Sequence, residues 1–139
     1  MKRFLSFLTV AIAATALSCT NANSGAKPKA AEIKFAEAEH DFGTIEQNSA
    51  AEYSFAYKNT GKEPLVISNV QTSCGCTVPE WTRDPVNKKK SGAVKVKYNT
   101  HAAGSFSKTI TVYSNASNSP VTLRIKGTVV PPKESQEKK

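Results

Sequence analysis

Apolar and polar residues alternate with a period of two along most of the chain from residue 33 to residue 130. In the run 52–58, for example, the aromatic residues Tyr53, Phe55 and Tyr57 occupy alternate positions and are expected to face a core. Such alternation is typical of strands with one buried face and one solvated face. Runs with this alternation, or rich in Val, Ile, Thr and aromatic residues, predict strands at 52–58, 65–70, 93–99, 105–113 and 121–129.

Two shorter apolar runs, 33–35 and 40–45, precede these strands. Turn-forming residues separate the runs at 59–62, 88–92, 99–104 and 115–120. No segment after residue 20 has the 3.6-residue period of a helix. About seven short strands with this spacing predict an all-β, immunoglobulin-like sandwich with mostly antiparallel strands, and a barrel is the alternative.

The first 18 residues have the pattern of a signal peptide. Two basic residues are followed by an apolar stretch from Phe4 to Leu17, and small residues then lead to Cys19. The stretch 16–19 resembles a loose bacterial lipobox, although its leucine lies two residues before the cysteine rather than three. We expect lipid attachment at Cys19, with ordinary signal-peptidase cleavage as the alternative. Several acyl chains would anchor the protein stably in a membrane.

The chain therefore divides into four expected parts: a signal peptide at 1–18, a flexible tether at 19–32, one folded domain at 33–130 and a disordered polar tail at 131–139. The length of 139 residues suits a single domain. No apolar run reaches the roughly 18 residues of a spanning helix. We expect a bacterial envelope protein at the outer membrane, facing the periplasm, and this location disfavours nucleic acid as a partner of the basic chain, whose net charge is +8.

Cys74 and Cys76 are the reactive side chains that the sequence places together. If Cys19 is acylated, the remaining two cysteines form an even set, as expected of an exported protein. Alternate Cα atoms of an extended strand lie roughly 6.6 Å apart, near the outer limit for a disulfide, and Gly75 allows the chain to tighten. Four interpretations stay open: a disulfide or thiol pair that shapes the loop, a redox-active pair, a zinc or copper site, or a point of covalent attachment or partner binding. No His or Lys lies beside the pair to activate a thiolate.

Two further features are candidate partner contacts. Trp81 lies five residues after Cys76, and exposed aromatic side chains often anchor interfaces. Packing over one end of the sandwich is the alternative role. The basic run of Lys88, Lys89 and Lys90 is either a solvated loop or a contact for anionic lipid headgroups or glycans.

Four stretches carry a family resemblance: His-Asp-Phe-Gly-Thr-Ile at 40–45, Phe-Ala-Tyr-Lys-Asn-Thr-Gly at 55–61, Leu-Val-Ile at 65–67 and Ser-Cys-Gly-Cys-Thr at 73–77. Together they resemble the Domain of Unknown Function 1573 (DUF1573) family over about residues 35–130. The resemblance implies a bacterial protein, often exported or lipid-anchored. It also implies an immunoglobulin-like sandwich related to cilia-associated and sperm-protein-like modules. It points to Cys74 and Cys76 as the residues to test.

The sequence carries no Gly-x-Ser-x-Gly, phosphate-loop or His-Glu-x-x-His motif. We therefore expect a non-enzymatic, lipid-anchored binding module of the envelope that takes a protein or glycan partner and needs no cofactor. Sheet edges are its expected docking surface, through added strands. The alternative is a thiol-based envelope protein that uses Cys74 and Cys76 for redox exchange or for carriage of copper or zinc.

Overall fold

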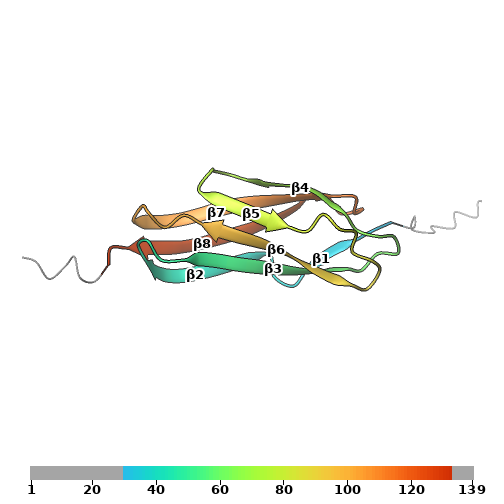
Figure 1. The fold of residues 1–139 in the computed structure, drawn as a ribbon, viewed down its shortest axis with the longest axis horizontal. Coiled ribbons are helices and arrows are strands. Elements are labelled where there is room, and N and C mark those ends of the chain that lie inside the picture. Colours follow the sequence, from blue (N-terminus) through green and yellow to red (C-terminus); the bar gives the residue numbers. More distant parts are fainter. Residues whose placement is uncertain (1–29, 133–139) are drawn as a thin grey trace, which may run out of the picture.

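A computed structural model describes residues 30–132 of the chain (Figure 1). The expected signal peptide, Cys19, the tether as far as residue 29 and the tail from residue 133 lie outside these residues. Among the described residues the regular structure is all β, and no helix able to cross a membrane occurs there. The strands are β1 (Ile33–Phe35), β2 (Glu39–Glu46), β3 (Ala51–Asn59), β4 (Ile67–Thr72), β5 (Thr77–Trp81), β6 (Ser91–Tyr98), β7 (Gly104–Ser114) and β8 (Val121–Val130).

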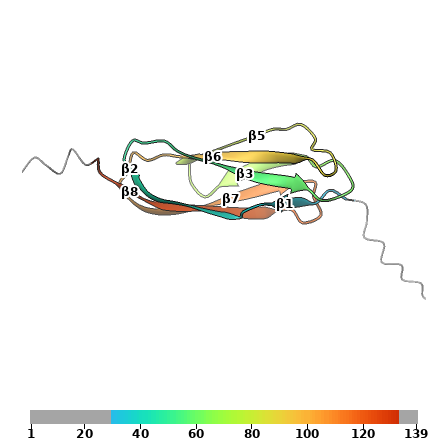
Figure 2. The same ribbon diagram turned by 90° about the horizontal axis from the view of Figure 1, so that it is seen from below.

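The strands form two four-stranded sheets, with the orders β1-β3-β6-β5 and β2-β8-β7-β4. The sheets face each other as the two layers of a sandwich (Figures 1 and 2), which confirms the predicted fold class. Neighbouring strands are antiparallel except β2 and β8, which are parallel. This exception arises because the start of the chain changes sheet: β1 pairs with β3, and after residues 36–38 the chain continues as β2 beside β8.

The alternation along each strand determines which side chains enter the core. In β3, Phe55 and Tyr57 are buried, whereas Ala56 and Lys58 are exposed on the outer face. Tyr53, on the inner side of the same strand, is half-buried and packs against the core. The largest fully buried side chains come from both sheets and include Phe55, Leu65, Val94, Val96, Ile110, Val112, Leu123, Ile125 and Val129.

One strand, β5, lies in a stretch for which the sequence predicted no strand. Its central residue is Pro79, which has no N–H and is excluded from central strands for that reason. β5 lies at an edge of its sheet and pairs with β6 alone, so the missing donor leaves no ladder bond unmade inside the sheet. At the N-terminus, Ala31 falls in the range predicted as tether, yet it is buried and bridges to Ala116. The packed region therefore starts slightly before residue 33.

The two ends of the described chain lie at opposite ends of the sandwich (Figure 1). Residue 30 lies beside the turns that follow β3 and β5, because the Lys62 N–H donates to the Ala30 carbonyl and the Asn59 N–H to the Lys90 carbonyl. We call the segments 30–34, 58–64 and 86–91 the basic pole. At the other end, the segments 46–50, 73–76 and 99–103 form what we call the disulfide pole.

Asn59 connects the segments of the basic pole. Its side chain is fully buried and makes four hydrogen bonds. Its Oδ1 accepts from the N–H groups of Gly61 at 2.9 Å and Glu32 at 3.4 Å, and its Nδ2 donates to the carbonyls of Glu63 at 2.7 Å and Val86 at 2.8 Å. A buried amide with every bond satisfied stabilises a single arrangement of the chain around it. The Asn-Thr-Gly motif thus has a structural role.

The Asp-Phe-Gly motif is structural as well. The Asp41 carboxylate accepts from the Gly43 N–H at 2.8 Å, and Gly43 has a φ of +64°, in the left-handed region. The pairing of β2 with β8 shifts register between Asp41 and Thr44. The motif therefore forms an irregular step in an edge strand.

Candidate functional site

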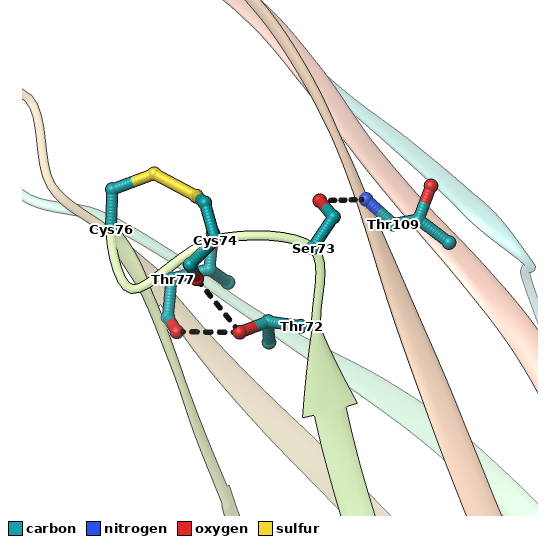
Figure 3. Close-up of a disulfide and its surroundings, with 6 residues drawn as sticks. All are labelled: Thr72, Ser73, Cys74, Cys76, Thr77 and Thr109. Atoms are coloured by element: carbon teal, nitrogen blue, oxygen red, sulfur yellow. Dashed lines mark hydrogen bonds between the residues drawn. A yellow bond between two sulfur atoms is a disulfide. The ribbon is translucent and has the colours of Figure 1, made fainter.

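A disulfide joins Cys74 and Cys76 in the turn between β4 and β5 (Figure 3). The S–S distance is 2.08 Å and the Cα atoms are 5.4 Å apart, closer than alternate residues of an extended strand. Gly75, which the bond encloses, does not have a positive φ, and a Cβ built there meets nothing within 4 Å. The turn therefore does not depend on glycine at this position. With both sulfur atoms in the bond, neither is a thiolate ligand in this state.

Neighbouring hydroxyl groups hold the turn in place. The Thr72 hydroxyl shares its proton between the carbonyl oxygens of Cys74 at 2.8 Å and Thr77 at 3.2 Å, as Figure 3 shows. The Ser73 N–H donates to the Thr109 carbonyl at 3.0 Å, and the Ser73 hydroxyl accepts from the Thr109 N–H at 3.2 Å. These bonds attach the turn to β7, the neighbour of β4 in the same sheet, so the disulfide loop is fixed to the sandwich.

The other two loops of the disulfide pole are bonded to each other and to this turn. The Asn99 N–H donates to the Cys76 carbonyl at 2.8 Å. The Thr100 hydroxyl, which is buried, donates to the Ser49 carbonyl at 2.6 Å. The three loops come from chain positions about 25 residues apart, yet they form one connected surface.

His101 belongs to the same network. Its ring Nδ1 hydrogen-bonds to the side-chain oxygen of Asn48 at 2.6 Å, and its carbonyl accepts from the Gln47 side chain. The Asn48 N–H donates to the Thr100 carbonyl at 3.2 Å. Asn48 has a φ of +64°, a conformation that asparagine tolerates better than most residues. Turn composition predicted the loop at 99–104, but nothing in the sequence indicates that it meets residues 47 and 48.

Trp81 lies at the end of β5 away from the disulfide turn. Its ring is half-buried against the core, and the Arg83 guanidinium lies 5.6 Å from the ring centroid. Its indole N–H is buried and has no hydrogen-bond partner among the described residues. Val78, on the same strand, is the exposed large hydrophobic residue of the described chain, at 54%.

The structure separates the candidate residues into distinct places. Cys74 and Cys76 lie at the disulfide pole, whereas Lys88, Lys89 and Lys90 lie at the basic pole beside residue 30. These two groups cannot act on one small ligand. Within residues 30–132, no three His, Cys, Asp or Glu side chains are grouped so as to hold a metal ion.

Four charged side chains of β3, β5 and β6 form ion pairs on the outer face of their sheet. Lys97 Nζ lies 3.4 Å from Glu52 and 3.5 Å from Glu80, and these carboxylates raise the pKa of Lys97. Lys95 hydrogen-bonds to Glu52 at 2.7 Å and thereby lowers the pKa of that carboxyl group. This part of the surface is neutralised internally, in contrast to the basic pole.

Each edge strand has a backbone group that bonds to a side chain. Such bonds occupy groups that an incoming strand would need. The pairs are the Ile33 N–H and carbonyl with Asn118, the Gly43 N–H with Asp41, the Val70 N–H with Asn69 and the Thr77 carbonyl with Thr72. Pro79 removes a further donor from β5. Docking by strand addition, expected from the sequence, therefore meets occupied groups at all four edges.

The family described as "Protein of unknown function (DUF1573)" matches residues 33–129. No curated protein matches the chain. Among solved structures, a protein of unknown function from Porphyromonas gingivalis W83 is 15% identical with a TM-score of 0.64, over 76% of this chain and 51% of that one. The PapD-like domain 7 of human CEP192 is 9% identical with a TM-score of 0.64, over 96% and 100%.

The VesB protease of Vibrio cholerae is 13% identical with a TM-score of 0.60, over 70% of this chain and 32% of the protease. This chain thus spans about half of the Porphyromonas protein and a third of the protease. At such low identities the likeness concerns the fold alone, and it agrees with the immunoglobulin-like sandwich predicted from the sequence.

Proposed function

This chain belongs to the family described as protein of unknown function (DUF1573), and from that premise we propose that it is a non-enzymatic binding module of the bacterial cell envelope. The observation that carries the proposal is the disulfide pole. Three loops meet there, and one of them is closed by the Cys74–Cys76 bond. The loops lie at the end of the sandwich opposite residue 30, where the described chain begins (Figure 1).

Fixed loops on a rigid scaffold suit binding because little conformational freedom remains to be lost when a partner docks. The bonds of Asn99 with Cys76 and of Thr100 with Ser49 supply that rigidity here. The occupied groups along the four sheet edges favour the loops over strand addition as the binding surface.

The chemistry of the disulfide pole indicates the kind of partner. Its exposed residues include Asn48, Ser73, Gly75 and His101, which offer hydrogen-bonding groups, a bare backbone and little charge. Such a surface fits a polar protein loop or a glycan in the periplasm. No cofactor is part of the proposal.

The membrane attachment is part of the proposal too. The basic start, apolar stretch and lipobox-like segment before Cys19 support acylation of that cysteine and retention at the outer membrane. The intact mass of the chain purified from bacterial membranes tests this directly. Acyl chains on the wild type and none on Cys19→Ser are expected, whereas a mature chain that starts at another residue without lipid would refute it.

Site-specific photo-crosslinking in living cells tests the binding role. A photoreactive amino acid replaces Gly75 or His101 at the disulfide pole, or Ser54 or Thr122 on the exposed outer faces of the two sheets. We expect one common adduct from the two pole positions and none from the faces. Equal adducts from the faces, or no adduct from the pole, would rule out this binding surface.

A second candidate function, thiol–disulfide exchange, is favoured by one observation: both cysteines are only partly buried, on either side of the exposed Gly75. In such an exchange a partner dithiol would be oxidised to a disulfide while the Cys74–Cys76 bond takes up two electrons and two protons. The groups that contact the turn are hydroxyls and backbone amides. Equilibration with glutathione buffers followed by alkylation distinguishes the two roles. A Cys74–Cys76 bond that stays oxidised in reducing buffer has a structural role, whereas a bond that is readily reduced supports exchange.

A further inference from the structure

The basic pole gathers lysines that form no ion pair within residues 30–132, at the end of the sandwich where the described chain begins (Figure 1). Its three segments carry two glutamates, Glu32 and Glu63. They also carry six lysines, namely Lys34, Lys58, Lys62, Lys88, Lys89 and Lys90. All six lysines are exposed, and within residues 30–132 none of them is in an ion pair.

The fold brings these lysines together rather than the sequence alone. Lys34 and Lys58 lie directly opposite each other on neighbouring strands, an arrangement that like charges disfavour. The Lys89 N–H donates to the Asn59 carbonyl, and the Lys90 carbonyl accepts from the Asn59 N–H, both at 2.9 Å. The Lys62 N–H donates to the Ala30 carbonyl, also at 2.9 Å. One asparagine therefore holds three separate basic segments on one surface.

Three lysines on the sheet faces, in contrast, are in ion pairs. Lys95 and Lys97 pair with Glu52, and Lys126 pairs with Glu39. Each of these three lysines thus has a carboxylate partner on its sheet face, whereas Lys108 of β7 has none among residues 30–132. The six lysines of the basic pole have no carboxylate partner of this kind within the described part of the chain.

Lys89 gives a second, independent sign of function. It has a φ of +66° at the third position of the turn that the Lys90 N–H closes onto the Asn87 carbonyl at 2.9 Å. A positive φ at this position favours glycine or asparagine. A lysine kept in an unfavourable backbone conformation suggests that its charge is useful there.

Next to these lysines the surface has an apolar hollow. Ala36 and Ala56 contribute to its lining, and Lys34 and Lys58 stand at its side. An apolar lining next to lysine side chains matches the boundary between phosphate headgroups and acyl chains in a bilayer. Soluble anions would use the ammonium groups but not the hollow.

We propose that the basic pole docks on anionic phospholipid headgroups of the bilayer that holds the N-terminus. The partner follows from charge complementarity and from the length of chain before the domain. Residues 20–30 span at most about 40 Å even when fully extended, so lipid on Cys19 confines this pole to the neighbourhood of the membrane. The inference thus rests on the proposed anchoring. Its consequence is a fixed orientation, with the disulfide pole directed away from the bilayer.

Lysine footprinting tests the docking on the full chain purified from bacterial membranes. The chain is combined with vesicles of phosphatidylcholine alone or with added phosphatidylglycerol, and amine acetylation is measured at each lysine by mass spectrometry. Phosphatidylglycerol should lower the labelling of Lys88, Lys89 and Lys90 several-fold and leave Lys95 and Lys126 unchanged. Salt at 1 M should restore labelling, because the Debye length is then about 3 Å.

A matched pair of variants makes the test specific. Changing Lys88, Lys89 and Lys90 to Gln should weaken docking about 100-fold, at roughly 1 kcal/mol per lysine near an anionic surface. The remaining basic-pole lysines should then lose their protection. The control, Lys95→Gln with Lys97→Gln and Lys126→Gln, removes the same charge from the faces and should keep that protection.

Two labelling results would overturn the proposed docking. One is equal labelling of the basic-pole lysines in neutral and anionic vesicles. The other is protection of these lysines by a soluble anionic polysaccharide but not by vesicles, which would assign the surface to glycans. The intact mass of the same sample reports acylation separately. Acylated chain without protection refutes the docking alone, whereas protection of an unacylated chain refutes the anchoring and retains the docking.

Discussion

The side-chain amide of Asn59 donates to the main-chain carbonyl of Val86 at 2.8 Å, across 27 residues of sequence. This bond joins the turn after β3 to the segment that leads into β6. The opposite side of the same amide accepts from Gly61 and Glu32, so one side chain connects three parts of the basic pole. The architecture of that surface therefore depends on a residue that is itself fully buried.

Replacing Asn59 should destabilise the domain strongly. Asn59→Ala removes four hydrogen bonds, of which those with Val86 and Gly61 are buried, and we expect a loss of about 3 kcal/mol in the free energy of unfolding. Urea denaturation of the two proteins measures it. The exposed Asn87 in the neighbouring turn is the control, because Asn87→Ala should change stability by less than about 0.5 kcal/mol. Similar small effects for both variants would refute the role of Asn59.

Two glycines of the family motifs, Gly61 and Gly75, should respond differently to alanine. A Cβ at Gly61 would lie 2.3 Å from the Ala30 carbonyl oxygen, so Gly61→Ala must displace the segment that enters the domain. We expect a loss of about 2 kcal/mol or more. At Gly75 a Cβ meets nothing, and Gly75→Ala should be nearly neutral. Thermal denaturation of both variants measures these effects. A larger loss of stability for Gly75→Ala than for Gly61→Ala would contradict the two turn geometries.

Loss of the disulfide should loosen one loop and leave the sandwich folded. The bond between Cys74 and Cys76 closes a loop of only three residues, so removing it should lower stability by less than about 2 kcal/mol. In the variant Cys74→Ser with Cys76→Ser, amide exchange of Asn99 should accelerate, since its N–H is bonded to the Cys76 carbonyl. Exchange in β7 and β8 should stay unchanged. Global acceleration would show that the bond supports the whole fold.

Stability and docking should change in opposite directions at Lys89. Lys89→Gly relieves the positive φ and should stabilise the domain by up to about 1 kcal/mol, whereas Lys89→Gln retains the conformation and should be close to neutral. Both variants remove one charge and should weaken docking on phosphatidylglycerol vesicles about fivefold. Denaturation and vesicle binding of the pair separate the two effects. A stabilised glycine variant with unweakened docking would show that the charge is not used.

The sequence predicts much of the sandwich because burial imposes a period of two on each strand. Phe55 and Tyr57 in β3 and Val94 and Val96 in β6 are buried as that pattern requires. The sequence did not predict β5 because it contains Pro79. A strand tolerates proline at the edge of a sheet, and the sequence alone does not show which strands are edges.

The site was predictable only in part. The sequence brings Cys74 and Cys76 within bonding reach, because their spacing is local. It does not reveal that His101 and Asn48 share a surface with them, or that Lys34 lies opposite Lys58. Those relationships depend on how distant segments pack, and no local pattern encodes them.

The central claim is the orientation of the domain, with the basic pole facing the bilayer and the disulfide pole facing the partner. The most direct measurement is fluorescence quenching on the full chain anchored in vesicles that contain headgroup-spin-labelled lipid. A fluorescent amino acid replaces Asn87 at the basic pole or Gly75 at the disulfide pole. Strong quenching at position 87 and little at position 75 is the expected result. Equal quenching at both positions, or stronger quenching at position 75, would contradict the orientation and with it the presentation of the disulfide pole.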